Sequence, residues 1–187
     1  VFFWVSVLFN FYIAPNRIFW FAKEWLQLLS GGLILLSAGL GLVFLRSSAQ
    51  GAILVAFLLV IIGLADTGAY FVGKRYGRHK LAPMISPGKT IEGLIGGVSA
   101  SALAVFLWVW LSRGYSAEIW QAVLIAALVA LAAAAGDLFE SAAKRKAGLK
   151  DSGAILPGHG GVLDRIDGML AATPVFVILY HYFPVLQ

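Results

Sequence analysis

Long apolar runs constrain this chain more than any other feature of its sequence. Stretches of about 18 or more apolar residues are long enough to cross a bilayer as helices. Hydrophobic residues make up 60% of the 187 residues and charged residues 12%, a balance that excludes a soluble globular domain and a disordered chain. We predict an all-α polytopic integral membrane protein with about six transmembrane helices. The six candidate spans are 1–14, which is short, 25–45, 51–72, 93–111, 119–136 and 168–186.

Basic residues lie mainly in three of the segments that connect these runs. Segments 15–24, 73–92 and 137–167 hold 12 of the 14 Lys and Arg residues, whereas Arg46 and Arg113 lie on the opposite side. Connecting segments that are rich in Lys and Arg face the cytoplasm in most membrane proteins. We therefore predict that these three segments are cytoplasmic, and that a polar, charged region lies at the cytoplasmic boundary.

The chain organisation follows from the same pattern. Residues 1–65 are predicted to form N-terminal transmembrane helices, and residues 66–187 a catalytic membrane domain with cytoplasmic loops 73–92 and 137–167. The chain opens at Val1 without a basic segment, so we expect it to be part of a longer protein rather than to begin with a signal peptide. It has no cysteine, which excludes disulfides and thiolate metal sites.

Acidic residues gather at the same boundary as the basic ones. Acidic side chains near the membrane are energetically expensive and usually have a function. The alternative is a structural role, in which they cap helices or pair with Lys or Arg. Asp164 and Asp167 are three residues apart and would share one face of a helix. Carboxylates beside cations that bind phosphate provide what Mg²⁺ needs. The clustered acids are Asp66, Glu92, Asp137, Glu140, Asp151, Asp164 and Asp167.

Two segments could bind phosphate. Gly88-Lys89-Thr90 resembles the end of a Walker A loop, but Pro83 stands where that motif needs glycine and no strand precedes it, so a P-loop is excluded. Lys89 and Thr90 are instead predicted to precede a helix, whose N-terminus favours phosphate, with Thr90 as the N-cap. Segment 157–161 is a flexible glycine-rich loop whose N–H groups could approach an anion. Gly93 and Gly97 suit close helix packing.

Three motifs lie between residues 66 and 167. They are Asp66-Thr67-x-Ala69-Tyr70, then Ser86-Pro87-x-Lys89-Thr90-x-Glu92-Gly93, and then Ser141 with Lys144-Arg145, Lys150-Asp151, His159-Gly160-Gly161 and Asp164-Arg165-x-Asp167. These motifs resemble those of the phosphatidate cytidylyltransferase (CDP-diacylglycerol synthase) family. The resemblance covers residues 66–174. Ala143 departs from the family pattern, which usually has a bulkier apolar residue there, and the family normally has further N-terminal spans.

The resemblance implies an enzyme that transfers the cytidylyl group of CTP to phosphatidic acid, giving CDP-diacylglycerol and pyrophosphate. It implies Mg²⁺ as cofactor, with a second cation in the same site left open, and a multi-pass protein of the cell (inner) membrane whose active site faces the cytoplasm. The implied partners are CTP, phosphatidic acid and the lipid bilayer, without nucleic acid, and a homodimer is left open.

The same resemblance, read with the charge pattern, assigns the site residues. The metal is assigned to Asp137, Asp164 and Asp167, and catalysis to these three with Lys144 and Arg165. His159 is given no proton-transfer role, since phosphoryl transfer depends mainly on positioning and electrostatics. Substrate binding is assigned to Asp66, Lys89, Thr90, Ser141, Arg145, Lys150, Asp151, His159, Gly160 and Gly161.

Three other functions fit parts of the pattern. A related CTP-dependent lipid enzyme, such as a polyprenol kinase or an archaeal-lipid cytidylyltransferase, would use similar residues. A cation-coupled transporter could use Asp66 and Asp137, but the acids gather at one boundary rather than at the midplane. A non-catalytic binder of anionic lipid could use residues 144–146, but it leaves the acids without a role.

Overall fold

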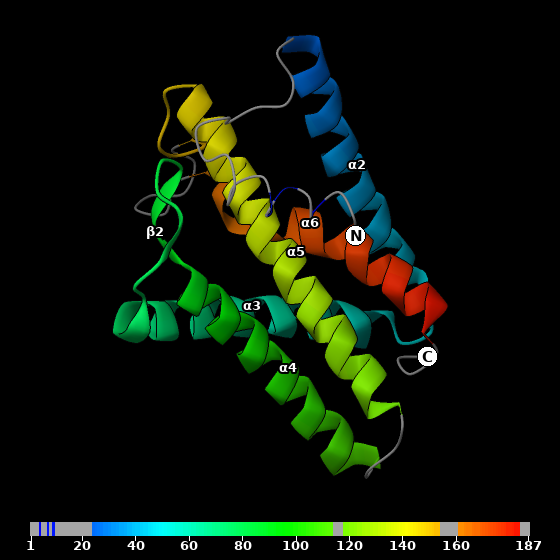
Figure 1. Ribbon diagram of the computed structural model, residues 1–187. Helices are drawn as coiled ribbons and strands as arrows, with labels where there is room; N and C mark the ends of the chain where they lie inside the picture. The colour runs from blue at the N-terminus through cyan, green and yellow to red at the C-terminus, as the bar shows by residue number, and fades with distance from the viewer. Residues whose placement is uncertain are drawn as a thin grey trace.

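The computed structural model describes residues 24–113, 118–153 and 161–183, together with Trp4, Val7 and Phe9. Five long helices and one short hairpin make up this part of the chain (Figure 1). They are α2 (Glu24–Ser47), α3 (Gly51–Tyr76), β1 (Lys80–Ala82), β2 (Ser86–Thr90), α4 (Ile91–Arg113), α5 (Ile119–Lys146) and α6 (Leu163–Tyr182).

The helices confirm an all-α polytopic membrane protein. Four of them contain segments that are long and apolar enough to cross a membrane: Gln27–Ser47, Gly51–Tyr76, Ile91–Ser112 and Ile119–Lys146. Helix α6 covers most of the last predicted span but is not one of these four. Apart from Trp4, Val7 and Phe9, the first predicted span lies outside the described residues. The predicted number of six is therefore approximate.

Several helices extend beyond the ends that hydropathy predicts. Helix α5 ends at Lys146 rather than at residue 136, and α6 begins at Leu163 rather than at residue 168. Segment 137–146 continues the helix because an acid and a lysine four residues apart pair on its surface, and because three basic residues at its end interact favourably with the helix dipole. The first part of the predicted loop 137–167 is therefore a rigid extension of α5.

The predicted loop 73–92 also contains regular structure. Helix α3 continues to Tyr76, and strands β1 and β2 pair antiparallel with Lys80 opposite Thr90. Thr90 is the N-cap of α4, as predicted: its hydroxyl oxygen accepts a hydrogen bond of 3.1 Å from the Gly93 N–H. The hairpin thus leads directly into α4.

Helix α5 runs through the middle of the molecule, packed between α4 and α6, and α3 packs mainly on α4 (Figure 1). Its core-facing side is rich in alanine, with residues such as Ala126, Ala133 and Ala135 almost fully buried. Small residues let the neighbouring helix backbones approach closely. The described core is therefore built around α5.

Helices α3 and α4 cross where glycine leaves no room for a side chain. A Cβ atom at Gly97 would lie 2.3 Å from the carbonyl oxygen of Ala65, and one at Gly93 would lie 2.9 Å from that of Ala69. The close packing predicted for this glycine pair is confirmed, and it holds the start of α4 against the end of α3.

Replacing Gly97 with alanine should therefore destabilise the protein. The new methyl group would force the two backbones apart, at a cost on the order of 1–3 kcal/mol. Gly63→Ala is the matched control, because a Cβ atom at Gly63 in α3 meets no atom within 4 Å. Thermal unfolding in detergent should give a lower midpoint for Gly97→Ala than for Gly63→Ala, and equal midpoints would contradict the close packing.

Candidate active site

A cavity of about 760 Å³ lies between the hairpin and helices α3, α4 and α5. Its wall near the hairpin is polar and carries Asp66, Lys74, Lys80, Lys89, Thr90 and Asp137. Farther along the helices the wall consists of small apolar residues, among them Gly97, Val98, Ala130 and Ala134. The cavity can therefore accommodate a charged group at one end and apolar chain at the other.

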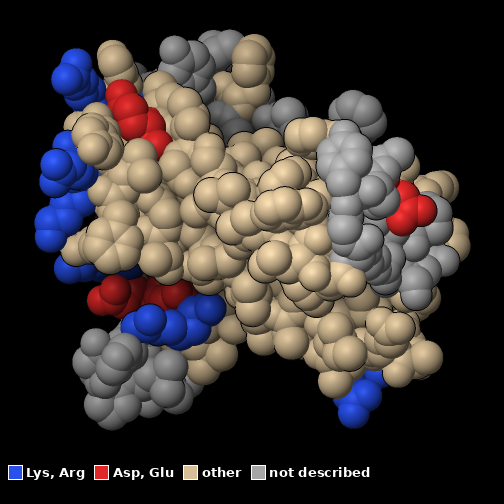
Figure 2. Space-filling view, turned by 90° about the horizontal axis from the view of Figure 1, so that it is seen from below, with Lys and Arg blue, Asp and Glu red and all other residues tan. Residues whose placement is uncertain are grey.

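The charged residues of the molecule gather around the polar end of this cavity. Figure 2 shows Lys and Arg side chains along one edge with Asp and Glu side chains next to them, while the broad middle of this face carries neither. The end of α3, the residues that connect it to β1 and the start of β1 carry four cations, which are Lys74, Arg75, Arg78 and Lys80. This clustering agrees with the charge distribution read from the sequence.

An ion pair between Lys89 and Asp137 joins strand β2 to helix α5. The second oxygen of Asp137 accepts a hydrogen bond of 3.3 Å from the Ser141 hydroxyl, one turn further along α5. Asp66 lies close enough to interact electrostatically with both Asp137 and Lys89. The structure thus brings together four predicted site residues from α3, β2 and α5.

Asp167, in the first turns of α6, faces the same group. Burial raises the pKa of the Asp167 carboxyl to about 7, and the negative charge of Asp137 adds to this effect. The Lys89 charge opposes the shift only partly. Carboxylates crowded in this way favour a bound cation or a shared proton.

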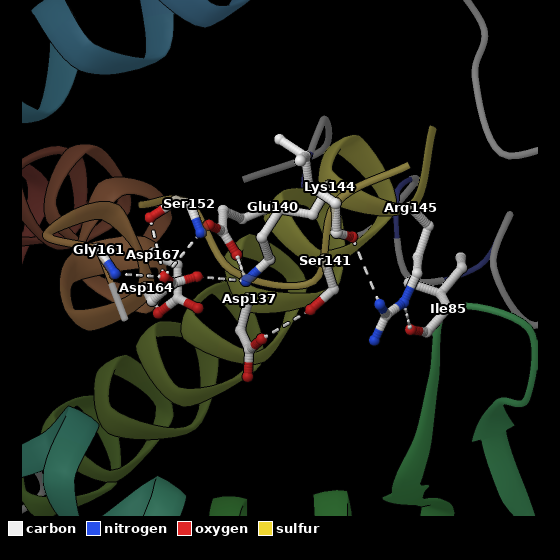
Figure 3. Close-up of polar contacts among 12 residues, drawn as sticks. Ile85, Asp137, Glu140, Ser141, Lys144, Arg145, Ser152, Gly161, Asp164 and Asp167 are labelled. Atoms are coloured by element: carbon white, nitrogen blue, oxygen red, sulfur yellow. Dashed lines mark hydrogen bonds and ion pairs between the residues drawn. The ribbon is translucent and has the colours of Figure 1, made fainter. Parts of the chain in front are cut away.

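A second cluster centres on Lys144, which contacts both Glu140 and Asp164 at 2.5 Å (Figure 3). The other oxygen of Asp164 accepts hydrogen bonds from the Ser152 N–H at 2.9 Å, the Ser152 hydroxyl at 2.9 Å and the Gly161 N–H at 2.8 Å. Asp164 therefore joins α5, the segment that follows it and the start of α6.

These contacts also fix the charge of Asp164. Burial alone would raise the pKa of its carboxyl, but the hydrogen bonds from Lys144, Ser152 and Gly161 outweigh burial and hold the pKa well below its usual range. Asp164 is therefore ionised near neutral pH. Both of its oxygens already have partners within the chain.

Other predicted residues have different surroundings. Arg145 donates to the carbonyl oxygens of Ile85 at 3.3 Å and Leu149 at 3.4 Å, and it points toward the hairpin rather than toward Asp137 (Figure 3). Lys150, Asp151 and Arg165 are exposed. Arg145 thus anchors the turn of the hairpin, and its predicted contact with substrate stays a prediction. The predicted residues His159 and Gly160 lie outside the described residues.

Several site residues were missed by the sequence analysis. Lys74, Lys80 and Tyr70 line the cavity, and Glu140 pairs with Lys144. The spacing of four residues between Glu140 and Lys144 was a usable signal for a helical pair. Nothing in the sequence places Lys80 beside Lys89, because only the hairpin brings them to one wall.

The acidic residues fit a magnesium ion in part. Within the described residues, no group of three or more His, Asp or Glu side chains is arranged to hold a metal by itself. Mg²⁺ is usually held by only one or two carboxylates and completes its shell with substrate phosphates and water. Asp137, which lines the polar end of the cavity, and Asp167, whose carboxyl interacts electrostatically with that of Asp137, provide that donor chemistry.

These features define a multi-pass membrane protein with a cavity that is lined by charged residues at one end, and comparison with known proteins gives its family. The profile of the cytidylyltransferase family matches residues 1–183, so the chain belongs to this family. It is 49% identical over 165 residues to a phosphatidate cytidylyltransferase of Pseudomonas aeruginosa, covering 88% of this chain and 61% of that protein.

Two further relatives carry the same name. The Haemophilus influenzae protein is 38% identical over 173 residues, covering 88% of this chain and 60% of that protein. The Staphylococcus saprophyticus protein is 41% identical over 142 residues, covering 75% of this chain and 54% of that protein. The chain thus spans a little over half the length of these relatives, and the family resemblance inferred from its motifs is confirmed.

Proposed function

We propose that the protein transfers the cytidylyl group of CTP to phosphatidic acid and releases pyrophosphate. The cavity carries this proposal, because it offers cations at the membrane boundary and an apolar wall deeper among the helices. A polyphosphate and a lipid headgroup would meet at the polar end, while the acyl chains would lie toward the apolar end. The relatives' names support this choice of substrates.

In this reaction an oxygen of the lipid phosphate forms a bond to the α-phosphorus of CTP. The bond from that phosphorus to the oxygen that bridges to the β-phosphate breaks, and its electron pair leaves with pyrophosphate. Two anions must approach each other, so fixed positive charge has to offset their repulsion. Lys89 and Lys80 line the cavity, where they can contact the nucleotide phosphates. Lys144 pairs with Glu140, whose charge acts on Asp167.

Asp137 and Asp167 would hold Mg²⁺ beside these lysines. The ion would supply charge neutralisation at the phosphates when it is bound. Lys89 orients the Asp137 carboxylate through their ion pair. Arg165, at the start of α6, is assigned to catalysis at the phosphates by the resemblance to the family motif. We further propose that the protein lies in the inner membrane with this site on the cytoplasmic side, as its basic segments indicate.

The reaction can be tested with two forms of radioactive CTP. The full chain in detergent with Mg²⁺ and phosphatidic acid should move label from the α-phosphorus of CTP into a lipid-soluble product, and should not move label from the γ-phosphorus. Transfer of the γ-label to a polyprenol would instead identify a lipid kinase. Cytidylyl transfer to an archaeal-type ether lipid in preference to phosphatidic acid would change the assigned acceptor, and absence of any labelled lipid would reject the enzyme.

Removing the charge of Lys89 should weaken nucleotide binding. Lys89→Met loses a charge-assisted contact to phosphate worth on the order of 1.5–3 kcal/mol, which corresponds to roughly a tenfold to hundredfold lower kcat/KM. Arg46→Met is the control, because Arg46 lies in the last turn of α2 on the side predicted to be opposite. Steady-state rates at varied CTP should separate the two variants, and equal losses would reject the role of Lys89.

A further inference from the structure

The turn between helix α3 and strand β1 is held by the carboxylate of Glu92, in the first turn of α4. Its two oxygens accept hydrogen bonds from the Arg78 N–H at 3.1 Å and the His79 N–H at 3.2 Å. The His79 ring nitrogen Nδ1 lies 2.6 Å from the same carboxylate. One side chain therefore fixes two successive backbone amides and an imidazole.

Neighbouring contacts join three elements at this point. The Ile91 N–H donates to the carbonyl oxygen of His79 at 2.9 Å, and the Gly77 N–H donates to that of Gly73 at 3.0 Å. Gly77 packs so closely on Thr90 that a Cβ atom would lie 2.7 Å from the Thr90 methyl carbon Cγ2. The end of α3, the start of β1 and the start of α4 are thus fixed relative to one another, and Glu92 provides the charged contact among them.

The hairpin that begins at this turn carries two lysines of the cavity wall. Lys80 stands opposite Thr90 in the strand pairing, and Lys89 precedes Thr90 in β2. Both lysines line the cavity, whereas Glu92 does not. Glu92 therefore does not contact an anion bound in the cavity, and its structural influence on such an anion passes through the position of the hairpin.

We propose that Glu92 is a positioning residue, which sets Lys80 and Lys89 at the spacing that binds the polyphosphate of the nucleotide. This inference rests on the proposed use of CTP. A displacement of about 1 Å at a reacting or binding group can change rates by up to a hundredfold. The simpler role for an acid in this position is favourable interaction with the N-terminal dipole of α4, which would affect stability without changing nucleotide affinity.

Replacement of Glu92 separates the two roles. Glu92→Ala should raise the dissociation constant and the KM for CTP on the order of tenfold, while the KM for phosphatidic acid changes less than twofold. Glu92→Gln keeps one oxygen that can accept the backbone hydrogen bonds, so its CTP affinity should lie between wild type and Glu92→Ala. Glu118→Ala removes the same charge from an exposed position at the start of α5 and should match wild type.

Amide hydrogen exchange gives a readout that needs no turnover. Peptides within 77–90 should exchange faster in Glu92→Ala than in wild type, with no such change in Glu118→Ala. A lower thermal midpoint with unchanged CTP affinity in both Glu92 variants would overturn the inference and leave the dipole role. Unchanged exchange in 77–90 would overturn it as well.

Failure of the inference can be told apart from failure of the proposed function. CTP binding is measured by calorimetry without lipid, so it does not require the reaction. If wild type bound CTP but formed no lipid-soluble nucleotide, the proposed function would fail, and the affinities of the Glu92 variants would still decide the inference. If wild type formed the product and Glu92→Ala bound CTP equally well, only the inference would fail.

Discussion

Replacing Asp137 with asparagine should leave a folded protein whose turnover is lower by on the order of a hundredfold or more. The amide keeps the shape of the side chain but loses the charge that Mg²⁺ requires. Asp137 also pairs with Lys89 and accepts a hydrogen bond from Ser141, so the variant disturbs the orientation of a cation as well. A partly exposed residue in this position should tolerate the change without unfolding.

Three measurements test this role for Asp137. Thermal unfolding checks that Asp137→Asn is folded, and the α-labelled CTP assay gives its turnover. A magnesium titration should show that the variant needs a higher concentration of the ion to reach half of its remaining activity. Glu118→Gln, which removes a carboxylate far from the cavity, should behave as wild type in all three. A stable and fully active Asp137→Asn enzyme would rule out the metal assignment.

The membrane helices could be predicted because lipid imposes a simple rule on sequence. A helix that crosses the bilayer has to be apolar over most of its length, so hydropathy found the segments of α2 to α5. Their ends were less predictable, because a helix continues for as long as its backbone and side chains favour it. Residues 137–146 are polar but helical, and hydropathy alone assigns such a segment to a loop.

The site could be predicted where local chemistry decides the structure. Thr90 lies just before a long apolar run, so it could be predicted as the N-cap of a helix, and its hydroxyl does cap α4. The contact of Lys144 with Asp164 was not predictable in this way, because 20 residues separate them and their meeting depends on how α5 and α6 pack. Likewise, the resemblance assigns Arg145 to phosphate binding, yet its guanidinium contacts the backbone carbonyl of Ile85 in the hairpin turn and that of Leu149.

Asp164→Asn should give a second large loss of activity, and its cause can be separated from a structural effect. The carboxylate contacts Lys144 through one oxygen and Ser152 and Gly161 through the other. Asparagine offers only one acceptor oxygen, so an NH₂ group would face either the Lys144 ammonium or the backbone N–H groups. We expect turnover to fall on the order of a hundredfold, together with a lower thermal midpoint.

The contribution of Asp164 to the stability of the folded protein depends on pH. Because the pKa of Asp164 is held low in the folded state, its contribution to stability is fully present above the unfolded pKa of about 3.9 and is lost only as the pH falls through the lower, folded value. The difference in unfolding midpoint between wild type and Asp164→Asn should therefore stay constant between about pH 6 and about pH 8.

Ser152→Ala distinguishes a catalytic Asp164 from one that only holds the chain. This variant removes the hydroxyl that donates to Asp164 but keeps the carboxylate charge and its contact with Lys144. If the charge serves catalysis, Ser152→Ala should retain turnover within about tenfold of wild type while Asp164→Asn loses much more. If Asp164 is only a structural ion pair at the start of α6, the folded fraction of Asp164→Asn should keep both its turnover and its magnesium dependence. In that case the substitution would lower only the unfolding midpoint. Asp164 of the family motif would then stabilise the start of α6 and would have no part in the reaction of the phosphates.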